Sequence, residues 1–205
     1  GAMSTLLDYS VPSLKEEFER MWNQAEKRTL SIEDFIRLNP DFMWLNPFRR
    51  EEVESVARKF VEAIINNEYI RPGSKGEVYN LALSMRKHGI LEPIIMAKCG
   101  DHYTVIDGNV RAIILREFYA HGIKGMNVPV IIMPFCFDKT KPLEYAKAII
   151  MSFTMHAVST RTLPVMIANE NVVRVVTDGL ITYYYAYLKS KGMDATLIDA
   201  LSNMD

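Results

Sequence analysis

One stretch decides the fold: Tyr103-Thr-Val-Ile-Asp-Gly-Asn-Val-Arg-Ala-Ile-Ile-Leu-Arg-Glu-Phe118. Up to Ile106 its residues are mostly β-branched or aromatic, which is typical of a strand. After Asp107 and Gly108 the apolar residues recur at helical spacing. Gly108 has no Cβ and therefore permits a tight corner between the two elements. The stretch predicts a strand that turns directly into a helix.

This corner has the features of an anion-binding site. We expect Asp107 or Asn109 to cap the helix, because a short side-chain oxygen can accept a hydrogen bond from a first-turn N–H group. The other first-turn N–H groups lie at the positive end of the helix dipole. Arg111 lies in the first turn of the expected helix, and its guanidinium N–H groups can donate two parallel hydrogen bonds to a phosphate. A purely structural corner with a surface arginine would show the same pattern, so both interpretations stay open.

The composition excludes several classes of protein. Of the 205 residues 49% are hydrophobic and 24% are charged, so the chain can bury a core and should not be disordered. The formal net charge of −1 argues against coating nucleic acid through bulk charge, although a local basic patch stays open. No apolar run is long enough to cross a membrane, and no secretion signal is present. We expect a soluble cytoplasmic protein with no membrane partner.

The two cysteines, Cys99 and Cys136, do not have the spacing of metal ligands. Disulfides are rare in the cytoplasm. We therefore expect two reduced thiols.

The chain divides into three regions by pattern. Residues 4–70 are expected to be a helical segment, residues 71–140 an α/β core and residues 141–205 a second helical region. The boundary near residue 140 is the place where mixed patterns give way to helical patterns only. The last region also carries four tyrosines within five positions, which predicts a homodimer contact more than a stacking surface for nucleic acid: Tyr183, Tyr184, Tyr185 and Tyr187.

The first region shows three helical patterns and an aromatic loop. The helices are expected over residues 13–28, after a capping box at Ser31-Ile-Glu-Asp34, and over residues 50–67. The loop between the second and third contains Phe42, Trp44 and Phe48 beside two arginines. Such aromatics could stack on bases. We favour the interpretation that they hold the loop against the core.

The core region contains a helix, a hairpin, a helix and a strand. A capping box at Ser74-Lys-Gly-Glu77 is expected to open the first helix, and Gly89 to end it. A turn after Cys99 predicts a β-hairpin, and residues 127–133 form an apolar run that is typical of a buried strand.

Three motifs in this region resemble one family. Leu81-Ala-Leu-Ser-Met-Arg-Lys-His-Gly-Ile-Leu-Glu-Pro-Ile-Ile95 is similar to the segment of ParB-type partition proteins in which a helix ends in glycine and leads through proline into a strand. Tyr103 to Arg111 resembles the Gly-x-x-Arg corner that follows, and Val128-Pro-Val-Ile-Ile132 resembles the next strand. The resemblance covers about residues 78 to 134 and implies a ParB/sulfiredoxin-like α/β fold with a small mixed sheet. It also implies a nucleotide or nucleic-acid phosphate held at the corner.

Departures from the family narrow the choice among its members. Sulfiredoxin needs a cysteine directly after the corner glycine, where this chain has Asn109, so reductase chemistry is not expected. Partition clamps carry a glutamate and two arginines there, and only Arg111 carries over. Their next motif, Glu-Asn-x-x-Arg, should fall near residues 152–156 and is missing. A CTP-switched sliding clamp is therefore not expected.

The run Asp-Gly-Asn-x-Arg is similar to the corner of phage-type ParB-like proteins and to the Asp-Gly-His-x-Arg corner of the free-serine kinases. This resemblance implies that Asp107 accepts a proton from an attacking hydroxyl or water, or holds Mg²⁺ beside the phosphates. Glu92, next to Pro93, is the second carboxylate expected near the pocket, although a solvated glutamate at a strand edge is the simpler interpretation.

Four further residues are weaker candidates. Arg86, Lys87 and His88 could contact phosphate, or could simply form the polar end of a helix. His156 could act as a distal acid or base, but nothing stands at a diagnostic spacing from it.

Three functions follow. The first is an enzyme, a nuclease or a kinase, that binds a nucleoside triphosphate or diphosphate, or DNA, at Gly108 to Arg111 and transfers a phosphoryl or phosphodiester group with Asp107 and Mg²⁺. The second is a non-catalytic DNA-binding partition or regulatory protein of a phage or plasmid. The third is an interaction protein with an inactive site. The single carboxylate Asp107 favours the first.

Overall fold

The computed structural model describes residue 20, residues 23–43 and residues 47–137, without the side chains of residues 47 and 48. Most of the predicted helix over residues 13–28 lies outside this range. So do Trp44, His156, the helices expected beyond residue 140 and their tyrosines. The compact unit described below comprises residues 25–44 and 48–133.

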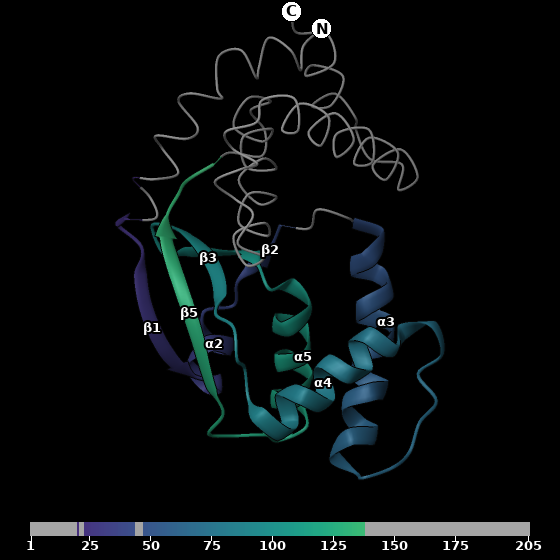
Figure 1. Ribbon diagram of the computed structural model, residues 1–205. Helices are drawn as coiled ribbons and strands as arrows, with labels where there is room; N and C mark the ends of the chain where they lie inside the picture. The colour runs from purple at the N-terminus through teal and green to yellow at the C-terminus, as the bar shows by residue number, and fades with distance from the viewer. Residues whose placement is uncertain (1–19, 21–22, 44–46, 138–205) are drawn as a thin grey trace, which may run out of the picture. The chain divides into compact units, whose positions relative to one another are not determined.

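Among the described residues, five strands form one mixed sheet in the order β1-β5-β3-β4-β2 (Figure 1). The strands are β1 (Glu26–Ser31), β2 (Asp41–Phe42), β3 (Ile94–Cys99), β4 (His102–Asp107) and β5 (Asn127–Pro134). β1 runs antiparallel to β5 and β3 antiparallel to β4, whereas β2 runs parallel to β4. The α/β fold with a small mixed sheet is thus confirmed.

In the described part of the chain, four helices accompany the sheet: α2 (Ile32–Arg37), α3 (Pro47–Ile65), α4 (Gly76–His88) and α5 (Asn109–Ala120). Alternate residues of β5, Val128, Val130 and Ile132, share one core cluster with Phe60 of α3 and Phe118 of α5. Of the intervening residues, Ile131 and Met133 are buried and Pro129 is partly buried, which confirms the expected buried strand. Segments on both sides of residue 70 contribute to this core.

The start of the chain is only partly as predicted. Ser31 caps α2, because its Oγ accepts a hydrogen bond from the Asp34 N–H at 3.1 Å. The predicted helix over residues 13–28 is wrong at its end, where β1 begins at Glu26. β1 is an edge strand whose first four residues are exposed, so it lacks the apolar alternation that marks most strands.

The prediction for α4 is wrong at the start of the helix and correct at its end. The expected capping box is wrong: a short 3₁₀ turn, η1 (Gly73–Lys75), precedes the helix, and the N-cap Lys75 makes no side-chain hydrogen bond. The expected end is confirmed. Gly89 has φ 72° and its N–H donates to the Met85 carbonyl at 2.9 Å.

The hairpin of β3 and β4 is confirmed, with an irregularity between Ile95 and Met96. The expectation of two reduced thiols is wrong, since Cys99 and Cys136 are both disulfide-bonded. Among the helices of the described ranges, none has the length and apolar character to cross a membrane.

Candidate phosphate-binding corner

The corner between β4 and α5 has the predicted course. β4 ends at Asp107, Gly108 adopts the left-handed conformation at φ 102°, and α5 begins at Asn109. The Gly108 carbonyl accepts the first helical hydrogen bond, from the Ala112 N–H at 2.9 Å. The N-cap position belongs to Gly108, which has no side chain, and Asn109 Oδ1 accepts no hydrogen bond from the described residues, so the expectation that Asn109 caps α5 is wrong. The positive end of the helix dipole therefore receives no hydrogen-bond acceptor from the side chain of its N-cap residue.

Arg111 turns back across the glycine towards the start of β3. Its Nη1 donates to the Glu92 carbonyl and, at 3.3 Å, to the Pro93 carbonyl. Its Nη2 lies 3.8 Å from Asp107 Oδ2, and the side chain is 14% exposed. A Cβ on Gly108 would stand only 3.0 Å from Nη2. The guanidinium can therefore occupy this position only because residue 108 has no side chain.

Asp107 is enclosed at the same corner. Its side chain is 7% exposed and faces the Arg111 guanidinium. A buried carboxylate loses its hydration and needs a positive partner to stay charged. In this arrangement Asp107 is the counterion of Arg111, and the pair joins the last residue of β4 to the first turn of α5.

Asn109 ties the corner to a distant part of the chain. Its Nδ2 donates to the Met43 carbonyl, directly after β2, at 2.9 Å. Its Oδ1 is buried and accepts no hydrogen bond from the described residues. We did not expect Met43 at the corner, because it lies 66 residues away in sequence and no motif marks it.

A comparison with protein families places this corner in a known domain. Residues 47–144 match the family model of the ParB N-terminal domain. The chain carries a ParB-like domain. The match spans just under half of the 205 residues and starts at α3, so β1, α2 and β2 precede it. No curated protein matches the chain significantly.

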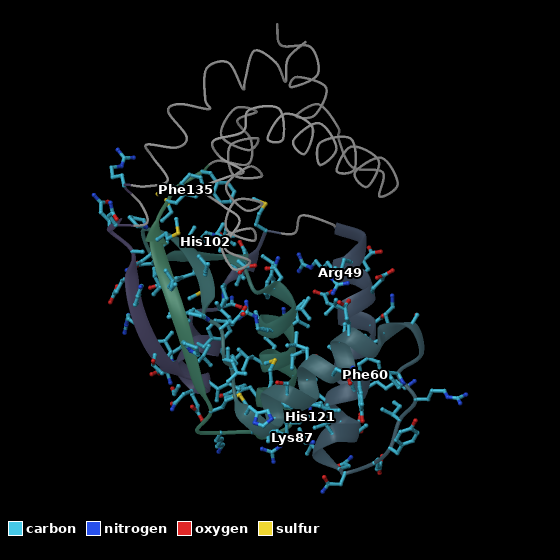
Figure 2. The ribbon with its side chains drawn as sticks, viewed as in Figure 1. Arg49, Phe60, Lys87, His102, His121 and Phe135 are labelled. Atoms are coloured by element: carbon cyan, nitrogen blue, oxygen red, sulfur yellow. The ribbon has the colours of Figure 1, made fainter. Side chains whose placement is uncertain are left out.

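The ParB-like domain brings some of the predicted site residues together and separates others. Glu92 reaches the corner through its backbone carbonyl, while the residue as a whole is exposed. Arg86, Lys87 and His88 form the exposed last turn of α4. Figure 2 shows Lys87 at the end of the domain where His121 closes α5. Because α5 has 12 residues and is therefore about 18 Å long, that basic turn lies a helix length from the corner.

The corner of the ParB-like domain does not fit Mg²⁺ well. The ion prefers oxygen ligands, commonly one or two carboxylates together with phosphates. Asp107 is the carboxylate available at the corner, and the Arg111 guanidinium already neutralises it. Within the described ranges no three His, Cys, Asp or Glu residues gather into a group that could hold a metal ion.

One aromatic residue of the predicted loop lies near this corner. Phe42 belongs to β2 and packs, partly buried, against the core cluster. This placement agrees with the interpretation that the loop aromatics hold the chain against the core. Trp44 lies outside the described residues, and so does the side chain of Phe48.

Proposed function

We propose that the ParB-like domain binds a phosphate group of a nucleotide or of DNA at the corner Asp107–Arg111, and that it works as a binding module. The observation that carries this proposal is the start of α5, where the N-cap residue is Gly108, which has no side chain to occupy the first-turn N–H groups, and where the Arg111 guanidinium lies one turn in. Free first-turn N–H groups at a helix N-terminus favour an anion. The match to the ParB N-terminal domain supports a nucleic-acid partner.

Arg111 is the residue that would change partners on binding. It now donates to two neutral carbonyls, those of Glu92 and Pro93. A phosphate at the start of α5 offers negatively charged acceptors, which attract the guanidinium more strongly than neutral carbonyls do and can accept two parallel hydrogen bonds from it. We expect the guanidinium to turn from the carbonyls to the phosphate, which frees the loop between α4 and β3.

Binding is better supported than catalysis. A general base or a nucleophile-activating carboxylate must come within hydrogen-bond reach of the reacting group. Asp107 is buried against Arg111, and Glu92 contributes its carbonyl to the same guanidinium. Phosphoryl or phosphodiester transfer by these two carboxylates therefore ranks second.

The test is a binding series by thermal shift and fluorescence anisotropy. ATP, ADP, CTP, GTP and a short DNA duplex are each added, with and without Mg²⁺, to the wild type, Arg111→Ala and Arg58→Ala. Arg58 is an exposed arginine of α3 and serves as the matched control. We expect Arg111→Ala to lose about tenfold or more in affinity, the value of one charge-assisted hydrogen bond, and Arg58→Ala to bind normally.

The arms of this series separate the alternatives. A shift by nucleotides assigns the phosphate to a nucleotide, and a shift by DNA alone assigns it to a phosphodiester. Wild-type protein that responds to none of these anions would overturn the proposal. Turnover that is present in the wild type and absent in a folded Asp107→Asn variant would restore the catalytic alternative.

A further inference from the structure

Two arginines from different helices share one aromatic ring at the edge of the sheet. The guanidinium carbons of Arg50 and Arg116 each lie 5.6 Å from the centroid of the Phe42 ring. Arg50 belongs to α3, Arg116 to α5 and Phe42 to β2. Since both cations are equally close to one centroid, they lie at most twice that distance apart. We call these three residues the arginine pad.

The pad keeps positive charge at the surface. Arg50 is 42% exposed along its side chain and forms an ion pair with Glu54 at 3.0 Å. Arg116 is exposed and has no ion pair in the described part of the chain. Within the described ranges the two guanidiniums thus share a single ion-paired carboxylate, that of Glu54, and the charge of Arg116 is available to an anion from outside the chain.

The ring also orients its two cations. A guanidinium that rests on an aromatic ring is held by the cation–π attraction while its N–H edge stays accessible. An oriented guanidinium loses less freedom when it binds a phosphate than a mobile lysine does. The ring is already in contact with two cations, which makes it a poor platform for a base. These features suit a phosphate backbone.

The pad and the corner lie along one side of α5. Arg116 follows Asn109 by two helical turns, so the two side chains project from the same face. Asn109 bonds to the Met43 carbonyl, and Met43 directly follows Phe42. Ala112 and Ile113, between them on this face, are buried, so a ligand that contacts both places would meet the corner at one end of α5 and the pad about 10 Å further along the helix.

We infer that the arginine pad contacts the sugar–phosphate backbone of a nucleic acid, without reading its sequence. The inference rests on the proposed function for its choice of a nucleic-acid partner, and it adds a second contact surface to the corner. Arginine and phosphate form paired hydrogen bonds, and two such sites along one helix suit a repeating polyanion better than a single small anion.

The test measures how DNA affinity depends on salt. Each phosphate contact contributes about 0.9 to the slope of log K against log salt concentration. We expect Arg116→Gln and Arg50→Gln each to lower the slope by about 1 and the affinity at low salt by several fold. Arg116→Lys keeps the charge and should keep the slope. Lys27→Gln, on the exposed strand β1 at the opposite edge of the sheet, is the matched control and should change neither quantity.

Two comparisons keep this inference separate from the proposed function. If the double variant Arg50→Gln/Arg116→Gln is folded by circular dichroism and binds DNA with the wild-type slope, the pad inference is wrong, whatever Arg111→Ala does. If the double variant loses DNA binding and Arg111→Ala keeps it, the pad inference stands, and the corner does not bind DNA; the corner proposal then fails altogether unless nucleotides bind the wild type and not Arg111→Ala. If the double variant keeps its binding to DNA and instead loses binding to an acidic peptide, the inference is also wrong.

Discussion

Gly108 meets two requirements at a single residue. Its φ of 102° lies in the left-handed region, which side chains with a Cβ adopt only with strain. It also leaves room for the Arg111 guanidinium, since an added Cβ would stand 3.0 Å from Nη2 and 3.2 Å from Ile94 Cγ1. The corner therefore depends on this glycine for its backbone and for the position of its arginine.

The first prediction separates these two contributions. Gly108→Ala should lower the free energy of unfolding by about 1–2 kcal/mol for the backbone and by about 1–3 kcal/mol more for the crowding of Arg111 and Ile94. Gly122→Ala is the matched control, because Gly122 has φ 91° and an added Cβ would meet nothing within 4 Å. Urea unfolding of both variants measures the difference. Equal losses would show that the guanidinium moves aside without cost.

Among the elements, α2 depends most visibly on a few polar contacts. It has only six residues, and short helices are marginal without support. Ser31 caps its start, and Glu33 Oε1 accepts a hydrogen bond from the Gly125 N–H, in the loop before β5, at 3.1 Å. Glu33 thus joins the first turn of α2 to the segment that leads into the sheet.

The second prediction concerns the pH dependence of this contact. The pKa of Glu33 is lowered from its ordinary value of 4.5, first by its own backbone N–H and then by the N–H of Gly125. Because the unfolded chain binds this proton at a higher pH, the carboxylate stabilises the fold above pH 4.5, and that stabilisation is lost as the pH falls through the lower folded-state value.

Urea unfolding from about pH 6 to about pH 3 checks this prediction in the wild type and in Glu33→Gln. The wild type should be the more stable protein at the upper end of the range, and the difference should shrink towards the lower end. A difference that stays constant over the whole range would contradict it.

At the scale of the whole molecule, the features that follow from local chemistry were predictable. The glycine end of α4, the hairpin and the buried strand β5 all depend on residues close together in sequence. β1 was missed because its Glu26, Lys27 and Arg28 are exposed, and only pairing with β5, about a hundred residues away, makes this segment a strand.

The site shows the same division between local and distant causes. The bend at Gly108 follows from the residues beside it and was predicted. The direction of Arg111 was not, because the carbonyls that hold it belong to residues 18 and 19 positions earlier in the chain. A sequence motif identifies the arginine, and tertiary contacts decide which way it points.

The position of β1 and β2 has a practical consequence for anyone who isolates this domain. Both border strands of the sheet precede the segment that matches the ParB family, which starts at residue 47. A fragment of residues 47–144 would leave β5 and β4 with bare hydrogen-bonding edges, which favour aggregation. We expect that fragment to scatter light at concentrations where a fragment of residues 23–144 stays clear. The segment that resembles the family would then begin at residue 47, whereas the segment that folds on its own would begin before β1.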